Sequence, residues 1–140
     1  MYAILRNERG SLLAMVALST VVICGMAGLA IDGARGYVAR AELSRAVDAA
    51  ALSGAATLRL GQDEAEQRIR SLAAANGVIP TLDPNTTLDV EFGMNEEGEN
   101  TVMVSATRRI PTFFMRVMGH DHLDVASIAE VTVPPLDRSQ

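Results

Sequence analysis

The sequence has no lysine and no tryptophan, and aromatic residues make up only 4% of its 140 residues. Much of its apolar content is alanine, valine and leucine, which favours closely packed helices over a β core rich in aromatic side chains. All 12 basic residues are arginine, which we attribute to GC-rich codon usage and not to function. The single cysteine, Cys24, cannot form an internal disulfide. A chain of this length has room for one small domain.

Positive charge is scarce as well. The formal net charge is −5 at pH 7, and the part of the chain after the first eleven residues is more acidic still. Such a domain lacks the basic surface that a nucleic-acid-binding protein needs, so we set that class aside.

Charge is missing altogether from residues 11–31, which lie between Arg9 and Asp32. At about 1.5 Å per residue, a helix of this length spans the hydrocarbon layer of roughly 30 Å. Arg6 and Arg9 precede the segment, which predicts that the short N-terminus stays in the cytoplasm. These signals predict a cytoplasmic N-terminus at residues 1–10 and a single transmembrane helix at 11–31. An extracytoplasmic α+β domain at 32–135 and a C-terminal tail at 136–140 follow.

Two other interpretations of residues 11–31 are open. A cleaved signal peptide would use Gly28-Leu29-Ala30 as its small-x-small site, but its apolar region usually runs for only about 7–15 residues, so we favour a retained helix. A buried core helix is disfavoured by an uncharged run of this length. Gly25 and Gly28 either form a packing face or reflect the ordinary tolerance of glycine in membrane helices.

The helix is expected to continue without a break from Asp32 to about Leu60, with a bend near Gly33 or Gly36. One apolar stripe follows steps of three and four residues: Leu43, Val47, Ala50, Gly54 and Leu58. Residues 46–56 are mostly small, so a partner subunit or the chain's own sheet can approach this helix closely. Asp48, among the alanines, either bonds to the sheet or a neighbouring subunit or lies in water.

A second helix is predicted after Gly61, with Asp63 as its cap and Glu66 completing a capping box, and Asn76-Gly77 ends it. A period of two then predicts a strand with an inward face, Leu88, Val90, Phe92 and Met94. A turn at residues 95–100 and a second strand to Arg108 complete a β-hairpin. A short helix at Thr112–Gly119 and a strand at Val125–Val133 follow. The fold class is therefore α+β with a three-stranded antiparallel sheet.

Two parts of this sequence resemble the TadE/TadG-like family of Tad (Flp) pilus-assembly proteins. The first starts with Arg9-Gly10, ends its membrane helix with Gly28-Leu29-Ala30-Ile31-Asp32, places Tyr37 five residues later and continues with the alanine-rich run from Leu43 to Ala55. The second is Ile110-Pro111-Thr112-Phe113-Phe114 with Met118-Gly119, followed by the last strand.

The resemblance implies a pilin-like structural or assembly component of a Tad-type pilus or secretion system in the bacterial inner membrane. Its expected partners are membrane lipid, other Tad pilus-assembly proteins and a second copy of the chain. The residues expected to pack helices are Gly25, Gly28, Asp32, Tyr37, Leu43, Val47, Asp48, Ala50 and Gly54.

Processing is expected, if anywhere, between Gly10 and Ser11. Prepilin-like relatives have a glutamate five residues after the processing glycine, whereas this chain has Met15. We therefore expect residues 1–10 to stay attached and the protein to remain mainly in the membrane. The chain is also too short for the long inserted domain of larger TadG-like members.

No catalytic arrangement stands out in the sequence, and we predict neither an enzyme nor a bound cofactor or metal. His120 and His122, the only histidines, would face the same side of a strand and could bind a metal, but third and fourth ligands are not evident and we favour an ordinary turn. Glu96, Glu97 and Glu99 lack the spacing of a calcium loop and fit a solvated turn. The rival of another class is a membrane-anchored extracytoplasmic ligand-binding module, which predicts a pocket lined by converging polar groups.

Overall fold

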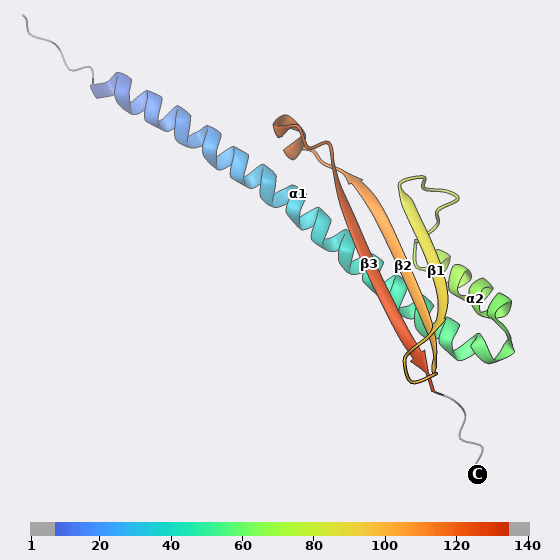
Figure 1. Cartoon of the computed structure of the whole chain (residues 1–140). Helices are drawn as coiled ribbons and strands as arrows, with labels where there is room; N and C mark the ends of the chain where they lie inside the picture. The colour runs from blue at the N-terminus through green and yellow to red at the C-terminus, as the bar shows by residue number, and fades with distance from the viewer. Residues whose placement is uncertain (1–7, 135–140) are drawn as a thin grey trace, which may run out of the picture.

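The computed structural model describes residues 8–134, and their side chains from Gly10 onward. It has the predicted α+β fold, in which one long helix, one shorter helix and a three-stranded antiparallel sheet make up the chain (Figure 1). The elements, in chain order, are α1 (Glu8–Thr57), η1 (Leu58–Leu60), α2 (Gln62–Ala75), β1 (Thr86–Met94), β2 (Asn100–Pro111), η2 (Met115–Met118) and β3 (His122–Val133). Arg6, most of the predicted cytoplasmic N-terminus and the tail at residues 136–140 lie outside the described residues.

Helix α1 is a single unbroken helix of 50 residues. At about 1.5 Å per residue it is roughly 75 Å long. It passes through Gly33 and Gly36 without interruption, so the bend expected there does not break the helix. Figure 1 shows its N-terminal part projecting beyond the rest of the protein, while its C-terminal part lies along the sheet.

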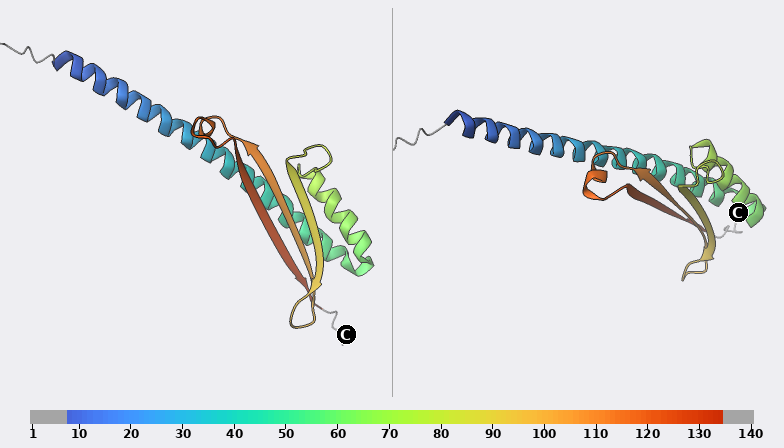
Figure 2. Two further views of the ribbon diagram at one scale, coloured as in Figure 1. Left: turned by 45° about the horizontal axis from the view of Figure 1, so that its top comes forward. Right: turned by 90° about the horizontal axis from the view of Figure 1, so that it is seen from above.

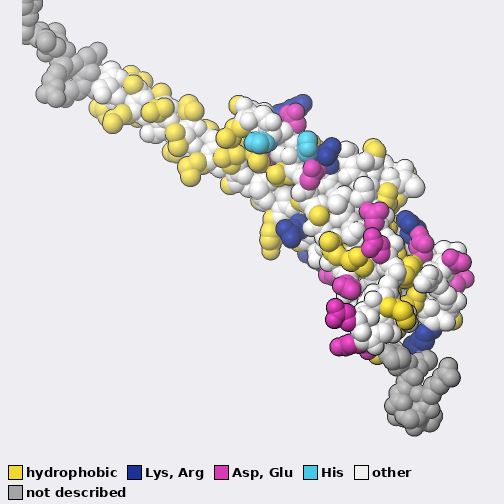
Figure 3. Space-filling view, viewed as in Figure 1, with side chains coloured by type: hydrophobic (Ala, Val, Ile, Leu, Met, Phe, Trp, Pro, Cys, Tyr) yellow, Lys and Arg dark blue, Asp and Glu magenta, His cyan; other side chains and the backbone are white. Residues whose placement is uncertain are grey.

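The two parts of α1 have different surroundings. Every residue from Gly10 to Ala27 is exposed, although most of these side chains are apolar. Figure 3 shows this part covered by hydrophobic side chains, with charged side chains appearing only where the sheet begins. Farther along, one face of the helix is buried in the core: Leu43, Ala46, Val47, Ala50, Ala51, Gly54 and Ala55. The predicted apolar stripe is therefore buried within this chain from Leu43 to Gly54, and its last member, Leu58, is partly buried.

The sheet has the order β1-β2-β3, and both pairs are antiparallel. Val104 at its centre pairs with Val90 on one side and Ala129 on the other. One face packs on α1, as Figure 2 shows from above. The alternation of β2 buries Val102, Val104 and Ala106 against the helix and leaves the intervening side chains more exposed.

Helix α2 packs beside the C-terminal half of α1 through Ala65, Ile69 and Ala73. The contact depends on Gly54, because a Cβ at this position would meet the Ile69 side chain closer than atoms can approach. The small residues of α1 therefore allow other elements of the same chain, such as α2, to pack closely against it.

Several element ends differ from the prediction. Gly61 and not Asp63 holds the cap position of α2, without a side-chain cap, and Asp63 lies in the first turn. The last strand begins three residues early, at His122, because its register with β2 continues to the Pro111–His122 pair. The predicted helix at Thr112–Gly119 is only the 3-10 turn η2. Met94, predicted to face inward, is 69% exposed because it ends β1 beside the hairpin turn.

Candidate functional site

Asp32 is the main polar residue buried between α1 and the connection from β2 to β3. Its side chain is 1% exposed. One carboxylate oxygen accepts the N–H of Phe113 at 3.0 Å, and the other accepts the N–H groups of Phe114 and Met115, both at 2.8 Å. These donors lie at the start of η2, where backbone N–H groups lack partners within the turn. Asp32 thus caps a turn that lies more than eighty residues away in the sequence.

The charge of Asp32 is stabilised by these donors. Burial alone would raise the pKa of its carboxyl group, but the hydrogen bonds from three backbone N–H groups and the positive charge of Arg35 together lower that pKa below its ordinary value of 3.8. The side chain therefore stays ionised at neutral pH, although water hardly reaches it.

Arg35 lies one turn farther along α1 and holds the same connection. Its guanidinium donates a hydrogen bond to the carbonyl of Pro111 at 2.9 Å. The same group lies 4.4 Å from the centre of the Phe113 ring, within range of a cation–π contact. Arg35 thus fixes the end of β2 while Asp32 fixes the turn that follows.

Gly28 completes this face of α1, one turn before Asp32. A Cβ at Gly28 would meet the ring of Phe114 closer than atoms can approach, so only glycine leaves room for this ring. Because Gly28, Asp32 and Arg35 are spaced by four and three residues, they lie on one side of the helix. We call these three residues, with the backbone of Phe113–Met115 that they hold, the clasp.

The connection itself, residues 112–121, is held in shape by internal contacts; we call it the β2–β3 loop. The N–H of Thr112 donates to the carbonyl of Asp121 at 3.1 Å, and its buried hydroxyl donates to the carbonyl of His120. Arg116 forms an ion pair with Asp121 at 3.1 Å. These contacts close the loop at its base, so the clasp holds a folded unit.

The outer surface of the β2–β3 loop is apolar. Phe113, Phe114, Val117 and Met118 are all exposed, Val117 to 90%. Part of this surface faces α1 across a hollow of about 290 Å³, lined by Cys24, Gly25, Leu29, Phe114, Val117 and Met118. The loop thus lies against the part of α1 that the sequence predicts to be in the membrane.

The other predicted site residues lie apart from the clasp. Leu43, Val47, Ala50 and Gly54 are buried in the chain's own core. Gly25 is exposed, Tyr37 is 77% exposed, and Gly10 and Ser11 lie in the first turns of α1. Asp48 lies on the exposed side of α1, where it accepts a hydrogen bond from Ser44 at 3.3 Å.

The histidines lie near the base of the β2–β3 loop. His122 lies 3.9 Å from a carboxylate oxygen of Asp124, whose main partner is Arg109 at 2.8 Å. Within residues 8–134 no three histidine, cysteine or acidic side chains gather closely enough to hold a metal ion.

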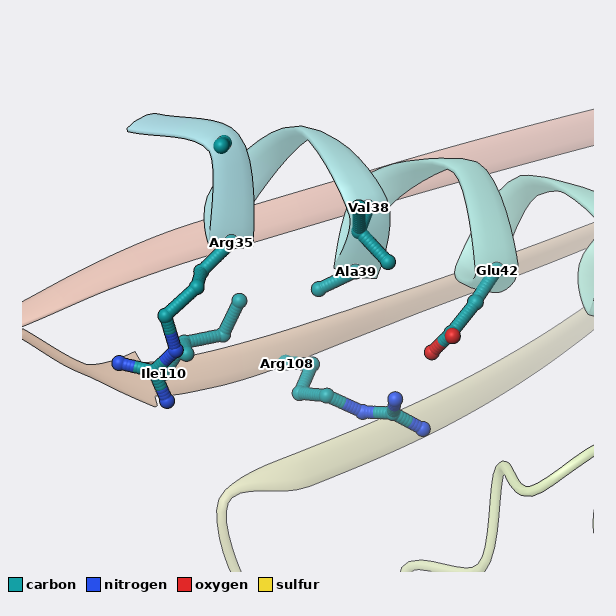
Figure 4. A pocket seen from close by; sticks show the side chains of 7 residues that line it. Arg35, Val38, Ala39, Glu42, Arg108 and Ile110 are labelled. Atoms are coloured by element: carbon teal, nitrogen blue, oxygen red, sulfur yellow. The ribbon is translucent and has the colours of Figure 1, made fainter. Parts of the chain in front are cut away.

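A groove of about 450 Å³ runs between α1 and β2 (Figure 4). Val38, Ala39 and Ile110 make much of its wall apolar, and the charged side chains of Arg35, Arg108 and Glu42 also line it, with Glu42 pointing towards Arg108. The Arg108 guanidinium donates to the carbonyl of Gly77 at 2.7 Å, as that of Arg35 donates to Pro111. Both arginines thus serve to hold the fold together.

Sequence reasoning selected Gly28 and Asp32 but missed Arg35 and Thr112. The only signal was the resemblance itself, since its two parts contain Asp32 and the residues from Pro111 to Phe114. In the structure these two parts touch, because three backbone N–H groups of the second part bind the carboxylate of the first.

Comparison with known proteins finds one family. Residues 10–57 match the Tad family model, described as putative Flp pilus-assembly TadE/G-like. The matched residues cover nearly the whole of α1. Neither the curated proteins nor the solved structures gave a match.

Proposed function

We propose that this chain, which carries the TadE/G-like segment of the Tad family at residues 10–57, is a pilin-like structural or assembly component of a Tad (Flp) pilus or secretion apparatus. It is anchored in the inner membrane by α1, crosses that membrane once and presents the α+β domain outside the cytoplasm. It acts by packing against partner subunits and not by catalysis.

The observation that carries this proposal is the unbroken helix α1. Its N-terminal part is long and apolar enough to cross a membrane, and its C-terminal part is the central element of the domain core. The family match includes both parts. A helix shared in this way couples the position of the domain to the membrane without a flexible linker, which suits a protein that positions other subunits.

The clasp supports retention of the helix over cleavage of a signal peptide. A cut after Ala30 would remove Gly28 and Leu29, against which the β2–β3 loop packs. Asp32 would then lie at a frayed chain end and could not hold the loop in place. A cut between Gly10 and Ser11 would leave every contact of the clasp intact.

The chain is proposed to be a resident membrane component and not the main filament subunit. In pilin-like filaments a glutamate in the apolar helix bundle is stable only when it meets a positive charge, such as the freed amino group of the adjacent subunit. Met15 occupies this place and offers no charge, so this attraction between adjacent subunits is missing.

The functional test uses a bacterium that carries this chain and builds surface filaments of this class. Deleting the gene should remove filaments from the material sheared off the cells, and the full chain should restore them. As a second variant, residues 32–140 exported behind a cleavable signal should fail to restore them, because both the anchor and the Gly28 contact of the clasp are missing. Undiminished filaments in the deletion strain would show that the chain is not part of this apparatus.

A further inference from the structure

We infer that the apolar tip of the β2–β3 loop, Phe113–Met118, is buried in the outer leaflet of the membrane beside α1. The domain would then be attached to the lipid at a second point in addition to its helix. The inference rests on the proposed span at residues 11–31, and its occupant is lipid.

The depth of the tip follows from what it touches. Val117 and Met118 line the same hollow as Cys24 and Leu29 of α1. These two α1 residues lie seven and two positions before Ile31, the end of the uncharged segment, which corresponds to about 10 Å and about 3 Å along the helix. If that segment fills the hydrocarbon layer, the loop tip must lie within the same layer.

The side chains at the tip suit lipid better than water. The exposed fractions are 62% for Phe113, 44% for Phe114, 90% for Val117 and 67% for Met118. Large apolar side chains gathered on one exposed surface indicate a surface that contacts a membrane or another protein. Here the surface is continuous with the bare part of α1, which favours lipid as the common environment.

Many of the backbone N–H groups of the tip have hydrogen-bond partners that do not depend on water. Irregular backbone is tolerated in a membrane only where its polar groups have partners. Asp32 accepts the first three N–H groups, and the N–H groups of Val117 and Gly119 donate to the carbonyls of Phe114 and Arg116. The clasp thus supplies hydrogen bonds that water cannot supply at this depth.

The charged groups of the loop, and Arg35 on the adjacent part of α1, are placed where they can reach the lipid headgroups. Arg116, the one charged residue at the tip, has a long side chain and binds Asp121 at the base of the loop. Arg35 lies four residues beyond Ile31, on the polar side of the boundary. This arrangement, an apolar tip with charges at its base, is that of an element lying about 5–10 Å deep in the interface.

The consequence is a fixed orientation. A single transmembrane helix can tilt and rotate, whereas a second attachment on one side of α1 restricts both movements. The clasp holds that attachment to α1, so the domain would present the same face to its partners in every copy.

Tryptophan fluorescence can test the inference directly, because the chain has no tryptophan of its own. The full chain with Val117→Trp is placed in phosphatidylcholine vesicles whose acyl chains carry bromine, which quenches nearby tryptophan. Val22→Trp, in the proposed span, is the positive control, and Leu60→Trp, at the end of η1 and 76% exposed, is the negative control. Val117 is exposed, so its replacement should leave the fold intact.

We expect blue-shifted emission and quenching of Val117→Trp comparable to Val22→Trp and several-fold stronger than Leu60→Trp. Quenching of Val22→Trp without quenching of Val117→Trp would overturn the inference and leave the span intact. Blue-shifted but unquenched Val117→Trp would mean that protein covers the tip, which also overturns it. Unquenched Val22→Trp would contradict the proposed span itself.

Discussion

At the scale of single residues, Asp32 is the buried polar side chain that joins α1 to the β2–β3 loop. It is buried, ionised and bonded to three backbone N–H groups of a turn from a distant part of the chain. A carboxylate suits this place because both of its oxygens accept and neither donates. An amide of the same size has only one accepting oxygen, so it cannot replace all three bonds.

The replacement Asp32→Asn should therefore lower the melting temperature of the detergent-solubilised full chain by several degrees at pH 7. The NH2 group of asparagine would replace one of the two accepting oxygens. At least one backbone N–H of the turn would then lose its acceptor. Asp48→Asn is the matched control, because Asp48 is exposed and should change stability by less than about 0.5 kcal/mol. Equal melting temperatures for all three proteins would refute the role of the clasp in stability.

Comparing the unaltered chain with Asp32→Asn over a range of pH tests the ionisation of Asp32. The pKa of Asp32 is lowered in the folded state, so its contribution is complete above the ordinary pKa of 3.8 and disappears as the pH falls through the lower folded value. The gap in melting temperature between the unaltered chain and Asp32→Asn should be constant from pH 7 to about pH 5. It should narrow at more acidic pH.

At the scale of elements, α1 combines two environments in one helix, and its glycines differ accordingly. Gly54 and Gly28 let Ile69 and Phe114 approach the helix backbone, whereas nothing lies within 4 Å of the position that a Cβ on Gly25 would occupy. Gly25 and Gly28, for which the sequence left open either a packing face or ordinary tolerance of glycine, therefore have different surroundings within this chain. Gly28 receives the β2–β3 loop, and Gly25 stays bare.

This difference predicts that replacing glycine by alanine affects the stability of the β2–β3 loop at position 28 but not at position 25. Gly28→Ala should push the Phe114 ring away and loosen the loop by about 1–3 kcal/mol, the usual range for overpacking. Amide hydrogen exchange of residues 113–115 should then accelerate roughly tenfold or more. Gly25→Ala, with open space around it, should leave that exchange unchanged, and equal exchange in both variants would contradict the clasp geometry.

The elements themselves could be predicted because their signals are local. A short stretch of sequence is enough to show the three- and four-residue steps of α1. The same holds for the alternation of β1 and β2 and for the turn between these strands. The conformation of the β2–β3 loop could not be predicted in this way. It depends on hydrogen bonds that the N–H groups of Phe113–Met115 donate to Asp32, and the pairing of Pro111 with His122 sets the start of β3. Arg35 was missed for the same reason, since its partners Pro111 and Phe113 are distant in sequence.

At the scale of the whole molecule, the protein is a rod with a small domain on one end. The domain carries most of the charged side chains together with scattered exposed apolar ones, whereas the free part of α1 is largely apolar (Figure 3). In the proposed topology the boundary between membrane and water would lie close to Asp32. The clasp would then lie at this boundary and join the two regions.

The claim on which the rest depends is that α1 crosses the membrane once and stays attached. It is tested by fusing a dual reporter, alkaline phosphatase with β-galactosidase, after Gln140 and measuring both activities, together with the intact mass of the membrane-bound chain. We predict active phosphatase, inactive β-galactosidase, resistance to carbonate extraction and a mass that includes residues 1–10. Active β-galactosidase, or a soluble exported product beginning at Ile31, would contradict the account.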